Sequence, residues 1–141
     1  MPVSNLGPAE VVTAELDTQV SDVVGEFNAK NVGAIVVVDD DEPVGIVTDR
    51  DVALAVDEEE NVATESVNAV MTDDPVTLQE DEEAMEISRI IEEHNVRRIP
   101  IVDESGKLTG IVTLDDLVAT IGEQLDDVAD TIEVQSPDYS P

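Results

Sequence analysis

The chain has 141 residues, of which 41% are hydrophobic, and its 35 acidic and six basic residues give it a formal charge of −29. This length fits one domain or two small, closely packed ones, and the acidity argues against nucleic-acid binding, which needs a basic surface. Because the chain has no cysteine, no apolar run approaching ~18 residues and no leader-like N-terminus, we expect no thiolate chemistry, membrane span or signal peptide.

The start of the chain predicts one strand and one helix. Residues 11–16 are a short strand candidate after an entry segment at residues 1–10. Asp17 or Thr18 can cap the helix that follows, and Asn31 ends it. Apolar residues at i, i+3, i+4 and i+7 give this helix one buried face, made of Val20, Val23, Val24 and Phe27.

Two more strands and a second helix follow. Residues 33–38 form a continuous, mostly β-branched run that is too short for a helix and is typical of a buried strand. An acidic turn at residues 39–43 leads to a strand at residues 44–47, and Thr48 opens the next helix. The predicted order of the first half is therefore β-α-β-β-α.

The second half repeats the first. Shifting the sequence by 64 positions aligns residues 12–39 with residues 76–103 without a gap. One extra residue in the turn at 103–107 raises the shift to 65, which superposes Gly45 on Gly110. A duplicated unit of about 60 residues buries too little surface alone. We therefore expect an α/β (α+β) fold in which two β-α-β-β-α repeats pack sheet to sheet about a pseudo-twofold axis.

The duplication also sets the expected boundaries within the chain. The first repeat covers residues 8–62 and the second covers residues 63–125. An acidic C-terminal tail, residues 126–141, follows them and is expected to fray.

One seven-residue motif occurs in both repeats. Gly45–Asp51 corresponds to Gly110–Asp116, and each copy has a Thr three positions before its final Asp. This pattern is typical of a helix-capping box. A helix start also presents unpaired N–H groups and a partial positive charge, so it suits a phosphate, while the carboxylate suits the hydroxyls of a ribose. A capping box is the commoner explanation for one copy, whereas two equivalent copies favour a nucleotide site.

Basic residues are so few that their positions are informative. Arg50 lies inside the first motif, and Arg97 and Arg98 directly precede the predicted strand at 99–102. Guanidinium groups bind phosphate bidentately, which makes these three arginines candidate phosphate ligands. The alternative is that they pair with neighbouring carboxylates. We expect the remaining basic residues to be surface charges; they are Lys30, Arg89 and Lys107.

The sequence places no group for catalysis or for metal binding. His94, the only histidine, stands at a predicted helix end with no adjacent nucleophile. The acidic runs at residues 39–42 and 57–60 can attract hard cations, but a solvated surface explains them better in so acidic a chain. We therefore expect no catalytic residue and no metal site.

The acidity itself suggests an environment. Disorder would remove the apolar periodicity, which is intact here, so an acidic surface on a folded domain is the better interpretation. Self-repulsion of this size is screened when the Debye length falls to ~3 Å near 1 M salt. We infer a cytoplasmic protein from an extreme halophile; a sharp folding transition in low-salt buffer without divalent ions would contradict this hypothesis.

Taken together, these motifs resemble the tandem cystathionine β-synthase (CBS) domain family. The resemblance covers residues 8–125 and rests on Val32–Asp39, Val44–Asp51, Val70–Thr72, Asn95–Asp103 and Gly110–Asp116. It implies a pair of β-α-β-β-α repeats, called a Bateman module, that often dimerises. It also implies a regulatory sensor of adenosine-containing ligands, namely AMP, ADP, ATP, S-adenosylmethionine or NAD.

The resemblance divides the candidate nucleotide-binding residues between two sites. It implies that Thr48 and Thr113 contact phosphate and that Asp51 and Asp116 contact ribose. The residues implied to complete the Thr113/Asp116 site are Thr13, Gly33 and Ala34. Those implied to complete the Thr48/Asp51 site are Val76, Thr77, Arg97, Arg98 and Pro100, with Arg50 as a further phosphate candidate.

The first repeat departs from the second at two places. Gly33-Ala34 occupy the place of Arg97-Arg98, and Gly7-Pro8 occupy the place of Met71-Thr72. The two sites are therefore unequal. We expect the Thr48/Asp51 site, with more cationic help, to bind a polyphosphate better.

The leading hypothesis is a regulatory module that senses AMP, ADP or ATP, forms a homodimer through its CBS repeats and transmits the ligand state to an effector protein. The alternatives are a structural dimerisation module with empty clefts and a sensor of S-adenosylmethionine or NAD. We expect no enzymatic activity, because the sequence places no nucleophile, base or metal cluster.

Overall fold

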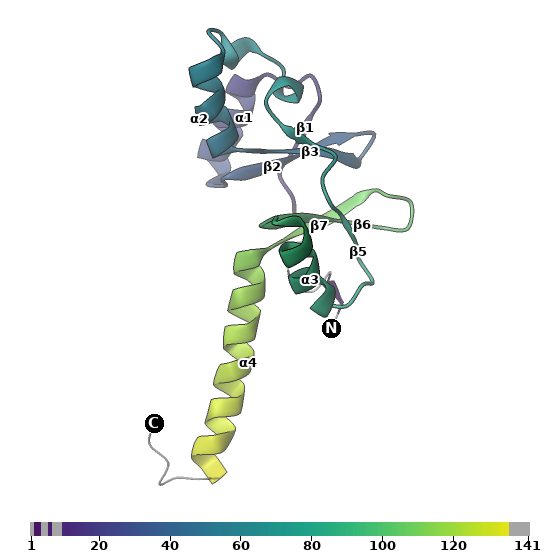
Figure 1. The fold of residues 1–141 in the computed structure, drawn as a ribbon, viewed down its shortest axis with the longest axis vertical. Helices are drawn as coiled ribbons and strands as arrows, with labels where there is room; N and C mark the ends of the chain where they lie inside the picture. Colours follow the sequence, from purple (N-terminus) through teal and green to yellow (C-terminus); the bar gives the residue numbers. More distant parts are fainter. Residues whose placement is uncertain (1, 4–5, 7–9, 136–141) are drawn as a thin grey trace.

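The computed structural model describes residues 2–3, 6 and 10–135, and it repeats one arrangement twice (Figure 1). The first repeat contains β1 (Thr13–Glu15), α1 (Val20–Lys30), β2 (Ala34–Asp39), β3 (Glu42–Thr48) and α2 (Asp49–Glu58). The second contains β5 (Leu78–Gln79), α3 (Met85–His94), β6 (Arg98–Val102), β7 (Leu108–Thr113) and α4 (Leu114–Gln135). Between them lie the short 3-10 helices η2 (Val62–Thr64) and η3 (Val67–Ala69) and the strand β4 (Thr72–Asp73). The predicted β-α-β-β-α order is confirmed in both repeats.

Two sheets form the centre of the molecule, one with the strand order β1-β2-β3-β4 and one with the order β5-β6-β7. In each repeat the first strand runs parallel to the second, which pairs antiparallel with the third. Both antiparallel pairs carry a register shift at equivalent positions, after Val37 and after Ile101. Figure 1 shows α1 and α2 on the outer side of one sheet and α3 and α4 on the outer side of the other. This arrangement confirms the predicted fold of two repeats packed sheet to sheet.

The two hairpin turns differ in length. Asp40 and Asp41 join β2 to β3 with φ angles of 51° and 64°, a left-handed conformation that Asp tolerates. In the second repeat, five residues separate the paired Val102 and Leu108, one more than separate the equivalent Val38 and Pro43, and they include Gly106 at a φ of 84°. Because the first turn needs only two residues, β3 begins at Glu42 rather than at the predicted residue 44.

Each repeat has its own aliphatic core. The buried residues of the first core are Val23, Ile35, Val37, Val47 and Val67. Those of the second are Val3, Leu78, Ile87, Ile99, Ile101 and Val112. In β2, Val36 and Val38 are buried as well as their neighbours, so both faces of this strand are covered, as a continuous apolar run predicts.

The two repeats exchange the segments that precede them. Val3, near the start of the chain, is fully buried in the core of the second repeat, and Val67, at the start of the second repeat, is fully buried in the core of the first. The Val3 N–H donates to the carbonyl of Glu82 at 2.8 Å, and the Val67 N–H donates to the carbonyl of Thr18 at 2.7 Å. The two donors, Val3 and Val67, are 64 positions apart, and so are the two acceptors, Thr18 and Glu82. The two contacts are therefore equivalent, and the exchange is reciprocal. From the sequence, residues 1–10 are expected to be only an entry segment, so this exchange was not predicted.

The linker between the repeats also completes the first sheet. β4 pairs antiparallel with β3, and Met71, just before β4, packs against the first core. A Cβ atom added at Gly45 would lie 2.3 Å from the Met71 sulfur, so any other residue here would force the Met71 side chain to move. Gly7-Pro8, which replace Met71-Thr72 in the first repeat, lie outside the described residues.

Two predictions about helix ends were wrong. Neither Asp17 nor Thr18 caps α1: its N-cap is Gln19, without a side-chain hydrogen bond, and the Thr18 hydroxyl instead accepts from the Glu15 N–H. The expected fraying from Asp126 is also wrong for the described residues, because α4 continues as a helix through Gln135. No helix in the described part of the chain combines the length and the hydropathy needed to cross a membrane.

Candidate functional site

The two Thr-x-x-Asp motifs form the starts of α2 and α4 in the same way. The Thr48 N–H donates to Oδ2 of Asp51 at 2.9 Å, and the Asp51 N–H donates to the Thr48 hydroxyl at 3.1 Å. Thr113 and Asp116 make the same two hydrogen bonds at the same distances. Both motifs are therefore complete capping boxes, each ending one strand and beginning the next helix.

The Thr and Asp side chains of the two capping boxes keep hydrogen-bonding capacity for a ligand. All four are half-buried rather than buried. The capping hydrogen bond occupies one carboxylate oxygen of each Asp, and a carboxylate has lone pairs for about four hydrogen bonds. Each helix start can therefore be capped and still offer an acceptor and a partial positive charge to a ligand.

Each helix start lies beside the second strand of its own repeat. The N–H of Asp49 donates to the carbonyl of Gly33 at 3.1 Å, and the N–H of Leu114 donates to the carbonyl of Arg97 at 2.9 Å. In the sheets, Ala34 pairs with Thr48 and Arg98 pairs with Thr113. The residue pairs Gly33-Ala34 and Arg97-Arg98 are therefore equivalent in space, as the alignment predicted.

The candidate arginines have exposed or partly exposed side chains. An Nη2 atom of Arg97 lies 3.8 Å from the Asp115 carboxylate, and the two side chains are 68% and 87% exposed. Arg98 is half-buried and Arg50 is exposed. The pairing of Arg97 with a neighbouring carboxylate is the alternative that the sequence left open, and at this exposure it is weak, so a phosphate can displace it.

The structure brings the predicted residues together within repeats. The contacts of Gly33 and Ala34 are with the Thr48 helix start, and those of Arg97 and Arg98 are with the Thr113 helix start. The resemblance had assigned each pair to the site of the other repeat, and that cross-repeat assignment stays a prediction.

The remaining predicted residues lie on the first strands and on β6. Thr13 is exposed on β1, opposite Val36, while Val76 and Thr77 directly precede β5. Pro100 is buried in β6. Thr13 lines a cavity of about 280 Å³ with residues of both repeats, namely Val11, Val38, Asp41, Lys107, Leu108 and Thr109. Neither Thr113 nor Asp116 lines this cavity, so it joins the repeats at their hairpin ends rather than at a helix start.

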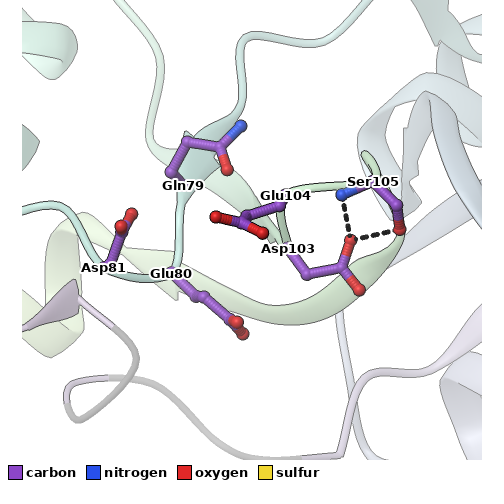
Figure 2. Close-up of a pocket in the computed structure, with 6 residues that line it drawn as sticks. All are labelled: Gln79, Glu80, Asp81, Asp103, Glu104 and Ser105. Carbon is purple, nitrogen blue, oxygen red and sulfur yellow. Dashed lines mark hydrogen bonds between the residues drawn. The ribbon is translucent and has the colours of Figure 1, made fainter.

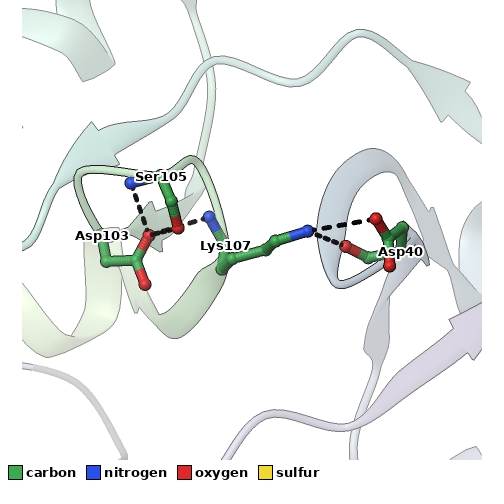
Figure 3. A network of polar contacts seen from close by, with 4 residues as sticks. All are labelled: Asp40, Asp103, Ser105 and Lys107. Carbon is green, nitrogen blue, oxygen red and sulfur yellow. Dashed lines mark hydrogen bonds and ion pairs between the residues drawn. The ribbon is translucent and has the colours of Figure 1, made fainter.

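Lys107 connects the two repeats at these hairpin ends (Figure 3). Its Nζ donates to the backbone carbonyl of Asp40 at 2.5 Å and lies 3.4 Å from the Asp40 carboxylate. The adjacent N–H of Leu108 donates to the carbonyl of Asp41 at 2.8 Å. Lys107 was expected to be an ordinary surface charge, so this bridge between the repeats was not predicted. Lys30 and Arg89, by contrast, pair within their own helices, with Glu26 and Glu86 respectively.

The turn that carries Lys107 is organised by Asp103. Oδ1 of Asp103 accepts from the Ser105 hydroxyl at 2.7 Å, the Ser105 N–H at 2.9 Å and the Lys107 N–H at 3.1 Å. These donors, the Ser105 hydroxyl first, hold the pKa of the Asp103 carboxyl below its usual value.

A surface hollow of about 400 Å³ beside this turn is acidic (Figure 2). Its lining residues are Gln79, Glu80, Asp81, Asp103, Glu104 and Ser105. Four carboxylates without a cation repel a phosphate, so this hollow is not a nucleotide site. Among the described residues, no group of three or more histidines and carboxylates is arranged to hold a metal ion.

Comparisons with known proteins agree on one family. A model of the CBS domain matches residues 3–58 and again residues 67–123. The uncharacterised protein YlbB of Bacillus subtilis is 40% identical over 127 residues, which are 85% of this chain and 84% of YlbB.

Solved structures resemble the chain over most of its length. The CBS-domain containing protein ATU1752 from Agrobacterium tumefaciens is 30% identical, with a TM-score of 0.74, over 85% of this chain and 98% of that one. CBSX2, solved in complex with AMP, is 27% identical, with a TM-score of 0.75, over 86% of this chain and 96% of that one. Both similarities cover the two repeats together.

Proposed function

Because the chain belongs to the CBS-domain family, we propose that it is a regulatory module that binds an adenine nucleotide (AMP, ADP or ATP) between its repeats. The observation that carries this proposal is the pair of equivalent, half-buried Thr-x-x-Asp helix starts. A module used only for its shape would need the two capping boxes but not the second carboxylate oxygen of each Asp, which the capping hydrogen bonds leave available. The similarity to CBSX2, which binds AMP, supports an adenosine-containing ligand.

The proposed roles follow from the chemistry of each side chain. The Thr48 and Thr113 hydroxyls and the N–H groups of their helix starts donate hydrogen bonds to the phosphates. The carboxylates of Asp51 and Asp116 bind the ribose hydroxyls. The base lies among aliphatic side chains and backbone, because the chain has only one Phe and one Tyr to stack on it. The residues proposed to complete the sites are Thr13, Gly33, Ala34, Val76, Thr77 and Pro100.

Arginine contributes the phosphate affinity in this proposal. Arg97 directly precedes β6, Arg98 is its first residue, and Arg50 lies in the first turn of α2. We retain the prediction that the Thr48/Asp51 site binds a polyphosphate better. The contact of Arg97 with Asp115 favours the other helix start, so comparing variants of the two sites shows which one the arginines serve.

The module passes its ligand state to an effector protein and performs no catalysis in this proposal. We propose that the chain forms a homodimer, as the family resemblance implies. We also propose that it lies in the cytoplasm of a cell with a high internal salt concentration, as its acidity suggests. The charge of −29 makes molar salt the appropriate condition for every assay.

The test measures ligand-induced thermal shifts with AMP, ADP, ATP, S-adenosylmethionine and NAD at molar salt. A ligand at 100 times its Kd stabilises the folded chain by about 2.7 kcal/mol. Asp51→Ala and Asp116→Ala each remove one ribose acceptor and should abolish the shift that comes from that site. Both also remove a capping box, which costs about 1 kcal/mol, so the shift is compared with each variant's own ligand-free melting temperature.

Asp115→Ala is the matched control, because Asp115 lies in the same first turn of α4 but is exposed and forms no capping box. It should keep or increase the ligand-induced shift, because the capping box stays intact and Arg97 is released from its pair with Asp115. Melting temperatures that no ligand changes would reject the nucleotide proposal and favour the structural dimerisation module. A response to S-adenosylmethionine or NAD alone would replace the adenine nucleotide by that ligand.

A further inference from the structure

Two polar contacts join the bodies of the repeats at the edge where their hairpins meet. The Leu108 N–H and the Lys107 ammonium both cross to the first repeat there. β3 and β7 run from these hairpins to Thr48 and Thr113, so the two helix starts lie at the opposite ends of the same strands (Figure 1). The capping hydrogen bonds of both helix starts stay within their own repeats. The hairpin edge is therefore well placed to set the angle between the repeats.

The two contacts at this edge restrain the repeats in different ways. The Leu108 N–H donates to the carbonyl of Asp41, and a single hydrogen bond of this kind leaves two bodies free to rotate about it. Lys107 adds a second point of attachment at Asp40, through a side chain that is only 35% exposed (Figure 3). The cavity of about 280 Å³ beside these residues shows that apolar packing does not fill the space between the hairpins. The angle between the repeats thus depends on the polar contacts.

Lys107 is also the only basic residue in the two hairpin turns. The Glu42 carboxylate lies against the second turn, since a Cβ atom added at Gly106 would be 3.8 Å from its Oε1. Glu42 is the counterpart of Lys107 in the first repeat, because Pro43 and Leu108 hold equivalent positions in the two hairpins. Without Lys107, two acidic turns would face each other and repel. Their carboxylates are Asp39, Asp40, Asp41, Glu42, Asp103 and Glu104.

We propose that Lys107 is a positioning residue for nucleotide binding: it fixes the angle between the repeats and so holds the two helix starts in their relative places. β3 and β7 have seven and six residues. Such strands are about 20 Å long, so a rotation of about 3° at the hairpin edge moves their far ends by about 1 Å. Binding groups must be held within about 0.5 Å of the productive geometry. The effect on affinity rests on the function proposed above, in which each site takes residues from both repeats.

Distances between spin labels measure the angle directly. The chain has no cysteine, so Ala53→Cys and Ala119→Cys, at exposed positions of α2 and α4, can each carry one label. Labelled chains are diluted with unlabelled chain, so that only distances within one chain contribute. Lys107→Ala should shift or broaden the distance distribution. The change should grow as the salt concentration is lowered, because repulsion between the turns is screened near 1 M.

Two further variants separate the bridge from the total charge. Lys30→Ala is the matched control, because it removes the same charge from a lysine that pairs with Glu26 within α1. It should leave the distances unchanged. Adding Glu42→Lys to Lys107→Glu moves the cation to the equivalent position of the other turn and should restore the wild-type distances. Circular dichroism confirms that each variant is folded at the salt concentrations used.

Calorimetric titrations with AMP and ATP test the consequence for binding. Lys107 directly precedes β7, at the end of the strand far from Thr113. Its replacement by alanine should nevertheless weaken binding about 10-fold, which is within the range known for residues that act at a distance. The loss should be similar at both sites. Lys30→Ala should bind both nucleotides as the wild-type chain does.

Four results would overturn the proposal. The first two are wild-type distances in Lys107→Ala and an equal change of distances in Lys30→Ala. The third is a double variant that behaves like Lys107→Glu alone, which would show that a bridging cation does not fix the angle. The fourth is a changed distance with unchanged affinity in Lys107→Ala, which would end the positioning role only. A wild-type chain that binds neither AMP nor ATP would instead reject the nucleotide function, and the distances would still show whether Lys107 fixes the angle.

Discussion

The exchanged segment at the start of the chain can be tested by shortening one side chain. Val3 is fully buried among residues of the second repeat, more than 70 positions away in sequence from Leu78, its nearest buried neighbour in that core. Val3→Ala removes two methyl groups from this core without introducing a polar atom or changing the charge. The equivalent change in the first core is Val67→Ala.

The size of the effect follows from the burial. Two buried methyl groups contribute about 1.6 kcal/mol to the free energy of unfolding, at about 0.8 kcal/mol each. The cavity left behind adds about 24 cal/mol per Å³, which brings the expected loss to about 2 to 3 kcal/mol of unfolding free energy. Because Val3 and Val67 are equally buried, the two variants should lose similar amounts.

The assay is urea denaturation at molar salt followed by circular dichroism. Val56→Ala is the matched control: Val56 lies on α2 and is 61% exposed, so its shortening should change the unfolding free energy by less than about 0.5 kcal/mol. A loss at Val3 no larger than at Val56, beside a full loss at Val67, would refute the reciprocal exchange.

Two further predictions concern single contacts. The lowered pKa of Asp103 means that its carboxylate stabilises the folded turn above its ordinary pKa of 3.8 and that this contribution is lost as the pH falls through the lower, folded-state pKa. Ser105→Ala removes the strongest donor, so in an NMR titration the pKa of Asp103 should rise; an unchanged titration would contradict the assigned cause. Gly45→Ala forces the Met71 side chain to move and should cost about 1 to 3 kcal/mol of unfolding free energy, part of which Met71→Ala restores. Gly25→Ala, on open helix surface, should instead stabilise by about 0.5 to 1 kcal/mol; a loss at Gly25 as large as at Gly45 would rule out the steric explanation.

The sequence predicted the repeats well because their signals are local. The β-branched run at residues 33–38 and its copy at residues 97–102 each contain the residues of nearly one whole strand. The Thr48 capping box likewise involves only residues within one helical turn. The segment at Val3 escaped prediction because its partners lie in the other repeat. Extending the internal alignment, with its shift of 64 positions, toward the N-terminus pairs Val3 with Val67. This match was the signal from which the exchange could have been predicted.

The errors at the end of the chain have a different physical origin. The residues after Asp126 were expected to fray because so many of them are acidic. Their charge lies on one side of α4, however, and apolar residues recur every three or four positions through the same stretch, at Leu125, Val128 and Ile132. The acidic composition suggested fraying, whereas the spacing of the apolar residues alone would have predicted a helix. Lys107 was misjudged for a related reason, since its partner Asp40 is 67 positions away.

The exchanged segments also bear on how the chain folds during synthesis. Domains generally fold as units, with the N-terminal one first as the chain emerges. Here the first core needs Val67, so the first repeat cannot close when its own last helix ends at Glu58. Val3 is made before all of its partners and must wait until β7, which ends at Thr113, has been added. The segment around Val3 thus reaches its final contacts late: the first core can close once Val67 has been made, whereas the second waits for Val112.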